Sequence, residues 1–164
     1  MDKLLLNHHL GAKMNKEKLD ATDIEIIRLL QTDGRRSYAD IASLLNLSPS
    51  GIQQRAHRLI ENGLLKIRAV VDAQLMGFPV SAMIALEVDG AVLREVAVEL
   101  ARLEEISYVV LCAGSYDIQI EVVCRDNTHL VDLITDISKI NGVRSSETFI
   151  YLEIVKNAYQ WGIP

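Results

Sequence analysis

Two predicted helices separated by only two residues constrain the fold of this chain more than any other feature. The first runs from Ser37 to Leu45. The second opens at Ser48-Pro49, where serine is a preferred N-cap and proline fits the first helical position. Only Asn46 and Leu47 lie between the two helices. A connection this short is typical of the turn in a helix-turn-helix.

A further helix is predicted immediately before this pair. Thr22, with Glu25 three residues later, has the spacing of a capping box, and the apolar periodicity continues to Gln31. The helix is expected to end at Asp33-Gly34, because glycine suits the left-handed conformation that follows many helices. In the next helix, the residues expected to face the core are Ile41, Ala42, Leu44 and Leu45.

The helix that opens at Ser48 has an apolar face and a polar face. The apolar face comprises Ile52, Ala56, Leu59 and Ile60. The polar face is rich in amide and guanidinium groups, which hydrogen-bond base edges and phosphates in a major groove. Any surface helix has polar residues outside, but here they follow a tight turn and a small Ser/Gly start. We therefore expect contact with double-stranded DNA through Ser48, Ser50, Gly51, Gln53, Gln54, Arg55, His57 and Arg58.

Charge is divided unevenly along the chain, whose formal net charge is −5. Residues 13–70 hold 10 Lys/Arg and 7 Asp/Glu, whereas residues 71–164 hold 6 and 14. A polyanion is therefore expected to meet the first part. Arg35 and Arg36, before the second helix, are either phosphate contacts or solvated loop charges.

A different pattern begins at residue 80. Strands and helices alternate as strand 80–88, helix 91–103, strands 106–113 and 116–123 around a Gly114-Ser115 turn, helix 126–140 and strand 143–155. This βαββαβ order predicts a ferredoxin-like domain, so the whole chain is classed as α+β. Both helices should cover one face of the sheet. The open face is expected to pair with another subunit.

The apolar, basic segment from Leu64 to Asp72 is predicted to be extended, either as a wing of the helix-turn-helix or as a linking strand. The predicted division of the chain is an N-terminal extension 1–17, a winged helix-turn-helix domain 18–66, a linker strand 67–79, a ferredoxin-like domain 80–156 and a tail 157–164.

With both halves in place, the sequence resembles the Lrp/AsnC family of bacterial and archaeal regulators. The resemblance spans residues 18–156 in the right order and includes the family's Gly-x-Tyr-Asp signature. The matching stretches are 19–27, 31–35, 41–42, 47–50, 55–65, 69–72, 75–77 and Gly114-Ser115-Tyr116-Asp117.

The resemblance implies a transcriptional regulator that binds DNA as a homodimer and assembles further into tetramers or octamers. It also implies a possible amino-acid effector bound between dimers. Carried onto this chain, the effector pocket comprises Gly114, Ser115, Tyr116, Asp117, Ser146, Glu147, Thr148 and the neighbouring Phe149. Asp117 would accept from the ammonium group of the effector, and N–H groups of the turn would face its carboxylate. The other interpretation of Gly114–Asp117 is a plain hairpin turn with a packed tyrosine.

Two alternatives to an effector-controlled regulator remain. One is an architectural DNA-binding oligomer that has no effector. The other is an enzyme resembling the sirohaem decarboxylases, which carry a His-Asn-Tyr-x-Arg stretch. Here that region is 106–110, Ile-Ser-Tyr-Val-Val, without the His or the Arg, so we expect no enzymatic activity.

No metal or other cofactor is expected from the sequence. The four histidines are scattered, and Cys112 and Cys124 should lie opposite Asp117 and Glu105 rather than opposite each other. No apolar run reaches the roughly 18–20 residues of a membrane span, and the start lacks a signal-peptide pattern. We therefore expect a cytoplasmic protein that makes no membrane contact.

Overall fold

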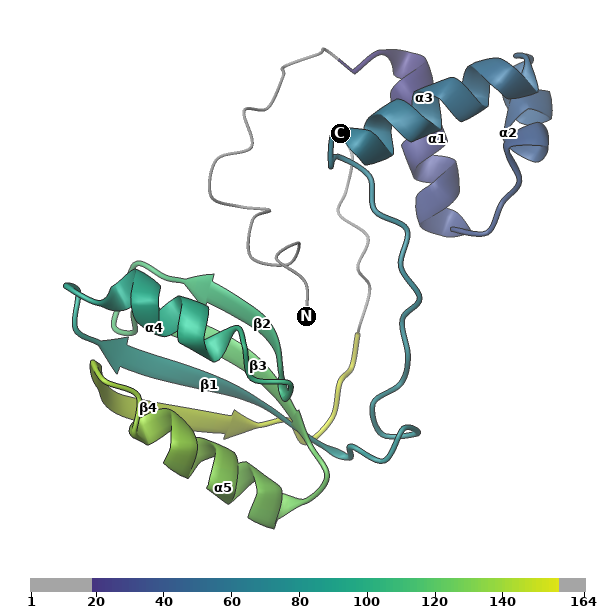
Figure 1. The fold of residues 1–164 in the computed structure, drawn as a ribbon. Helices are drawn as coiled ribbons and strands as arrows, with labels where there is room; N and C mark the ends of the chain where they lie inside the picture. Colours follow the sequence, from purple (N-terminus) through teal and green to yellow (C-terminus); the bar gives the residue numbers. More distant parts are fainter. Residues whose placement is uncertain (1–18, 157–164) are drawn as a thin grey trace. The chain divides into compact units, whose positions relative to one another are not determined.

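The structure is a computed structural model that describes residues 19–156. The chain divides into two compact units, one ending at Val70 and the other running from Val71 to Lys156 (Figure 1). The predicted extension 1–17 and tail 157–164 lie outside the described residues. Within residues 19–156, no helix combines the length and apolar character needed to cross a membrane.

Three helices form the first unit: α1 (Ala21–Thr32), α2 (Tyr38–Leu45) and α3 (Pro49–Glu61). Ser37 caps α2 and Ser48 caps α3, as predicted, each accepting from the backbone N–H three residues on. Asn46 takes the left-handed conformation between α2 and α3, with φ of 53°. This permits the tight turn, since asparagine tolerates that region better than most residues.

The predicted start and end of α1 were wrong in detail. The N-cap is Asp20, not Thr22, and the capping box pairs Asp20 with Asp23. The helix ends at Thr32, but its C-cap Asp33 is extended and Gly34 has no positive φ. Glycine takes the left-handed role after α3 instead, at Gly63, with φ of 71°.

The core of the first unit lies where the three helices meet. It comprises Ile26, Ile27, Leu30, Ile41, Ala42, Ile52, Ala56, Leu59 and Leu65. Two residues predicted to face it do not: Leu44 is 59% exposed and Ile60 is 38% exposed. Both lie at the edge of an apolar stripe that is narrower than the sequence pattern suggested.

The segment after α3 contains no strand. Residues 66–72 have no regular structure, and a turn follows over residues 73–77. The predicted linker strand 67–79 was therefore wrong, and no β-wing forms in the described part of the first unit. Alternating apolar and basic residues resemble a strand pattern, but a strand also needs a partner for its backbone groups.

The second unit contains a four-stranded antiparallel sheet with strand order β2-β3-β1-β4. Its elements are β1 (Val80–Val88), α4 (Leu93–Leu100), β2 (Ile106–Leu111), β3 (Ile118–Cys124), α5 (Asn127–Ser138) and β4 (Val143–Ile150). This is the predicted ferredoxin-like βαββαβ arrangement. Helix α4 and strand β4 are shorter than predicted, because their apolar patterns continue into turns and irregular chain.

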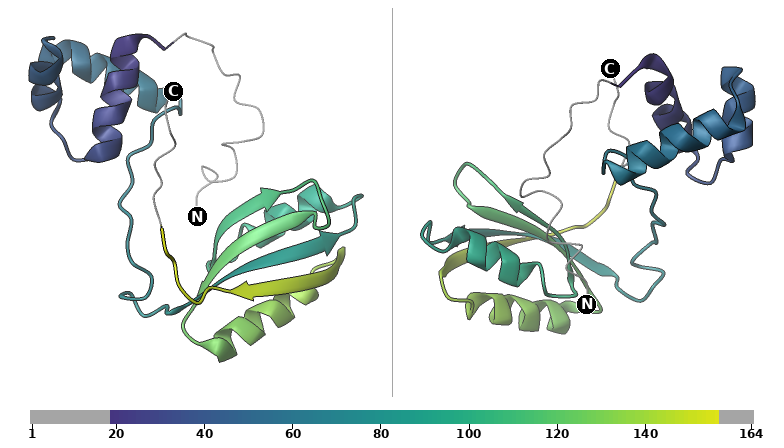
Figure 2. Two further views of the ribbon diagram at one scale, coloured as in Figure 1. Left: turned by 180° about the vertical axis from the view of Figure 1, so that it is seen from behind. Right: turned by 45° about the horizontal axis from the view of Figure 1, so that its top comes forward.

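Both helices cover the same face of the sheet (Figure 2). Alternate residues of β1 and β3, such as Ile84 and Ile120, point into this layer and are fully buried. Residues between them, such as Met83 and Glu121, lie on the other face, which neither α4 nor α5 covers (Figure 2). The predicted one-sided sheet is thus present.

The hairpin register agrees with the predicted turn except beyond one irregularity. The Cys112 N–H donates to the Asp117 carbonyl at 2.8 Å, so these residues are paired as predicted. The register shifts between Ile106 and Tyr108, which places Glu105 opposite Val123 instead of Cys124. Both cysteines are free thiols.

Candidate functional site

An exposed polar stripe runs along α3. Ser50, Gln53, Gln54 and His57 are all exposed, and their spacing of three, four and seven residues places them on one side of the helix. The rings of His57 and Tyr38 of α2 pack in a T-shaped arrangement, with the ring centroids 6.1 Å apart and the planes at 76°. This contact orients His57 while leaving it exposed.

The start of α3 lets another molecule approach closely. Ser48 Oγ accepts from the Gly51 N–H at 3.2 Å. A Cβ atom on Gly51 would lie 3.0 Å from that oxygen, so glycine at this position keeps the cap unstrained. Small residues at a helix N-terminus expose backbone N–H groups, which attract anions such as phosphate.

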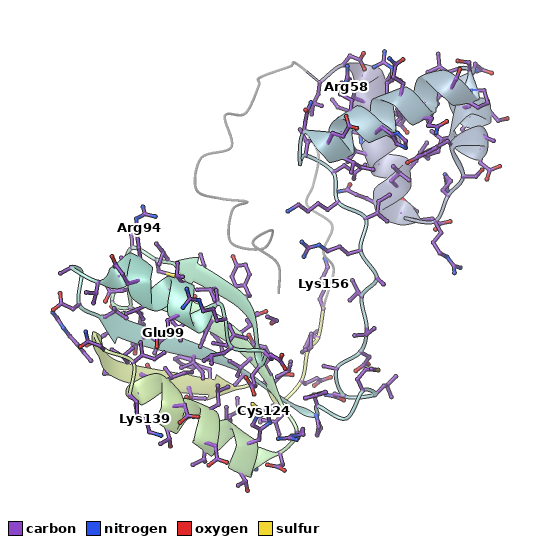
Figure 3. The ribbon with its side chains drawn as sticks, viewed as in Figure 1. Arg58, Arg94, Glu99, Cys124, Lys139 and Lys156 are labelled. Carbon is purple, nitrogen blue, oxygen red and sulfur yellow. The ribbon has the colours of Figure 1, made fainter. Side chains whose placement is uncertain are left out.

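Arg55 and Arg58 do not extend this polar stripe. Nη1 of Arg55 donates to Asp20 at 2.6 Å and to Asp23 at 2.9 Å, and Nη2 of Arg58 donates to Asp23 at 2.7 Å. Both arginines are therefore paired with carboxylates of α1, and their contact with DNA, expected from the sequence, stays a prediction. Arg58 lies in the last turn of α3 (Figure 3).

These ion pairs link α1 and α3. The carboxylate of Asp23 is 1% exposed, and both its oxygens accept from guanidinium groups. The backbone N–H of Asp23 and the Arg55 guanidinium hold the pKa of Asp20 below its ordinary value. Hydrogen bonds to Asp20 and Asp23 raise the pKa of Arg55, so the Arg55–Asp20 pair is charged at neutral pH.

Arg35 and Arg36 lie in the loop between α1 and α2. The Arg35 backbone N–H donates to Asp33 Oδ1 at 2.9 Å, which shapes this loop. A hollow here is lined by both arginines but also by Asp33 and Asp40. The surface is thus of mixed charge, and the choice between phosphate contact and solvated charge stays a prediction.

In the second unit, the Gly114–Asp117 turn is fixed to the end of β1. Asp117 Oδ2 accepts from the Val88 N–H at 2.8 Å, and the Asp117 N–H donates to the Leu86 carbonyl at 2.9 Å. The Asp117 carboxylate therefore accepts a backbone hydrogen bond from β1 beyond the last residue pair between β1 and β3. Asp117, the predicted acceptor for the ammonium group of an effector, therefore already uses one carboxylate oxygen within the domain.

Tyr116 connects the same turn to β4. Its O–H donates to the Glu147 carboxylate, which raises the pKa of Tyr116. Glu147 pairs with Ala85 across β1 and so lies on the open face of the sheet. Two of the predicted effector residues, from separate parts of the chain, are thus brought together.

Ser146 and Thr148 do not join this pair. They lie opposite Leu86 and Ile84, whose side chains face the helices. Successive residues of a strand point to opposite faces, so a run of consecutive β4 residues cannot line one pocket on one face. Within the predicted pocket, Glu147 and Phe149 share the open face and Ser146 and Thr148 do not.

Three residues with evident roles were missed in the sequence. Asp20 and Asp23 bind the α3 arginines, and Tyr151 donates to Glu121 Oε1 at 3.0 Å on the open face. The spacing of Asp20 and Asp23 would have placed both at the start of α1. Nothing local pointed to the arginines more than 30 residues away.

Residues 19–156 contain no group of three or more His, Cys, Asp or Glu side chains arranged to hold a metal ion. The pair formed by His129 and Glu105, at 3.1 Å, instead links the start of α5 to the start of β2. Cys124 is fully buried in the core of the second unit (Figure 3), and this burial raises the pKa of its thiol.

Comparison with known proteins places both units in one family. The family model of the AsnC-type helix-turn-helix domain matches residues 19–60, and that of the Lrp/AsnC ligand binding domain matches residues 81–161. An uncharacterized HTH-type transcriptional regulator of Pyrococcus abyssi is 37% identical over 150 residues, covering 90% of this chain and 95% of that protein. The HTH-type transcriptional regulator FL11 of Pyrococcus horikoshii is 32% identical, covering 84% of this chain and 92% of that protein.

Solved structures agree. Escherichia coli AsnC matches with a TM-score of 0.75 and 27% identity, covering 89% of this chain and 98% of that one. A Neisseria meningitidis transcriptional regulator in complex with L-Met matches with a TM-score of 0.81 and 22% identity, covering 88% and 97%, and shows the same fold. From these matches and from its two units, this chain belongs to the Lrp/AsnC family of helix-turn-helix transcriptional regulators.

Proposed function

We propose that this regulator reads DNA sequence with Ser50, Gln53, Gln54 and His57 of α3. The observation that carries the proposal is their exposure along one side of a helix that follows the short turn after α2. Glutamine makes bidentate hydrogen bonds with adenine, and serine and histidine reach base edges or phosphates. The capped start of α3, at Ser48 and Gly51, contacts phosphates of the DNA backbone. Arg35 and Arg36 contribute further phosphate contacts.

Selection from random duplexes tests this assignment. Wild-type protein should enrich a short, two-fold symmetric pattern, because a dimer presents two α3 helices to two half-sites. A Gln53→Ala/Gln54→Ala variant should lose the base preference at specific positions while keeping weak binding to all duplexes. A Gln74→Ala variant, altered at an exposed glutamine in the turn over residues 73–77, is the matched control and should select the wild-type pattern. Enrichment of one pattern by all three proteins would exclude the assigned readout.

The proposed effector is an amino acid, bound beside the Gly114–Asp117 turn. The proposal is supported by the match to the Lrp/AsnC ligand binding domain and by the L-Met complex of the structural neighbour. Glu147 is the better candidate for the ammonium group, because Asp117 already accepts from the Val88 N–H. Gly114 and Ser115 are exposed in the same turn, and their N–H groups suit a carboxylate.

The open face of the sheet is the proposed dimer interface. Tyr108 and Phe149 are 55% and 41% exposed on this face, which favours burial against a second copy. Its carboxylates Glu121 and Glu147 each accept from a tyrosine O–H, so covering them costs less than burying unpaired charges. Such a dimer can associate further into tetramers or octamers, which would alter how many DNA sites are bound together.

Sedimentation of a Phe149→Asp variant tests the interface. We expect a monomer with an intact fold, because an added charge on each copy would be buried without a partner. A Val131→Asp variant, changed at an exposed position on α5, should sediment like wild type. If Phe149→Asp forms the wild-type oligomer, the open face is not the interface.

A further inference from the structure

We propose that Asp20 and Asp23 of α1 are specificity-determining residues, because they withhold Arg55 and Arg58 of α3 from DNA phosphates. The inference rests on the proposed DNA contact by α3. Helix α1 contributes none of the proposed base contacts. Its two aspartates nevertheless set how much of the DNA affinity is independent of base sequence.

The geometry holds both arginines against α1. Arg55 donates through one nitrogen to Asp20 and Asp23, at 2.6 Å and 2.9 Å. Arg58 donates to the other oxygen of Asp23, at 2.7 Å. In the described part of the chain, these ion pairs thus join two carboxylates to two guanidinium groups.

The acids cannot easily move away. Asp23 is buried, and its N–H donates to Asp20 Oδ1 at 2.8 Å in the capping box of α1. Turning either carboxylate outward would break the helix cap as well as the ion pairs. The arginines are therefore held by groups that the fold itself fixes.

The arginines lie at the border of the DNA-facing stripe. Their side chains are 33% and 42% exposed, and with Gln54 they line a hollow at the surface of α3. Arginine at such a border would, without its carboxylate partners, reach a phosphate. Phosphate contacts raise affinity for every sequence, so they dilute the preference that Gln53 and Gln54 provide.

The inference predicts a change in salt dependence. Each additional phosphate contact steepens the slope of log K against log salt concentration by about 0.9. Asp23→Asn frees hydrogen-bonding capacity on both arginines, whereas Asp20→Asn frees it on Arg55 alone. The slope should steepen in both variants, and more in Asp23→Asn. The ratio of affinities for selected and mixed-sequence duplexes should fall in the same order.

The experiment measures fluorescence anisotropy of a labelled mixed-sequence duplex with the full chain at several salt concentrations. Glu61→Gln is the control, because it removes the same unit charge from an exposed position at the end of α3. We expect Asp20→Asn and Asp23→Asn to bind more tightly and with steeper slopes than Glu61→Gln. Adding Arg55→Gln to Asp20→Asn should restore the slope of the control, which a purely structural role of Asp20 would not predict.

If both aspartate variants keep the slope of Glu61→Gln, the inference is overturned and the acids only stabilise the fold. Circular dichroism melting shows whether Asp23→Asn folds; if it does not, the half-exposed Asp20 carries the test. If wild-type protein binds neither selected nor mixed-sequence DNA, the proposed DNA contact itself fails, which is a separate result.

Discussion

The guanidinium of Arg58 donates to the buried carboxylate of Asp23 at 2.7 Å, joining the end of α3 to the start of α1. The same carboxylate accepts from Arg55. Helix α3, which we propose contacts DNA, is thereby fixed to α1 through charge-assisted hydrogen bonds, in addition to apolar packing.

Arg58→Ala should destabilise the first unit. Removing one donor leaves a buried carboxylate with a single arginine partner, which costs about 1–3 kcal/mol. Urea unfolding should show this loss in the helix-turn-helix transition, while the oligomer stays intact. Gln54→Ala should weaken DNA binding with little change in stability. Unchanged stability in Arg58→Ala, together with lost DNA affinity, would restore the interpretation of Arg58 as a DNA contact.

Two substitutions of Asp117 distinguish its structural role in the turn from a role in effector binding. In Asp117→Asn the amide oxygen can still accept from the Val88 N–H, so stability should be close to wild type. Asp117→Ala leaves that backbone group without its acceptor and should cost about 1 kcal/mol. Thermal melts with and without amino acids distinguish the roles. A stabilising amino acid that acts on wild type but not on Asp117→Asn would show that the carboxylate charge binds the effector.

Gly142→Ala should destabilise the second unit. Gly142 has a φ of 98°, and an added Cβ would lie 2.3 Å from a Val92 methyl carbon. Backbone strain of this kind costs about 1–3 kcal/mol, before the clash is counted. Denaturant unfolding measures the loss, and Gly142→Ala/Val92→Ala should recover part of it. No recovery would mean that strain at residue 142 is the whole effect.

Stability of the second unit should fall at alkaline pH. Burial and the hydrogen bond to Glu121 raise the pKa of Tyr151 to about 12. In the unfolded chain tyrosine loses its proton near about pH 10. The stabilisation from neutral Tyr151 is therefore complete below that pH and is lost as the pH rises toward the folded pKa. The free energy of unfolding, measured across this pH range, should fall less steeply in Tyr151→Phe than in wild type. Equal slopes would contradict the role of the Tyr151–Glu121 hydrogen bond.

Local rules predicted the parts of the fold that depend on neighbouring residues. Ser37 and Ser48 cap their helices by accepting hydrogen bonds from backbone N–H groups three residues later in the chain. Such a contact depends on no distant residue. The start of α1 was misassigned because Asp20–Asp23 and Thr22–Glu25 both have capping spacing. The spacing alone cannot rank the two pairs.

Contacts that depend on a distant partner could not be predicted from the sequence. The side chains of Arg55 and Arg58 are long enough to turn toward either side of the polar face of α3. Only the packed fold brings Asp23 within their reach. On β4, resemblance to the family indicated a run of neighbouring residues, Ser146 to Phe149, as part of the effector pocket. The pleat then divided it, leaving Glu147 beside Tyr116 and placing Thr148 on the other face.

The most direct test captures genomic DNA fragments on the purified protein at near-physiological salt, with and without the twenty amino acids, and sequences what is retained. The account predicts a few enriched sites with two-fold symmetry, and a changed set or yield when the amino acids are present. Uniform retention of all fragments would contradict sequence-specific regulation and favour an architectural DNA-binding protein. Absence of any retained fragment would contradict DNA binding by α3 altogether.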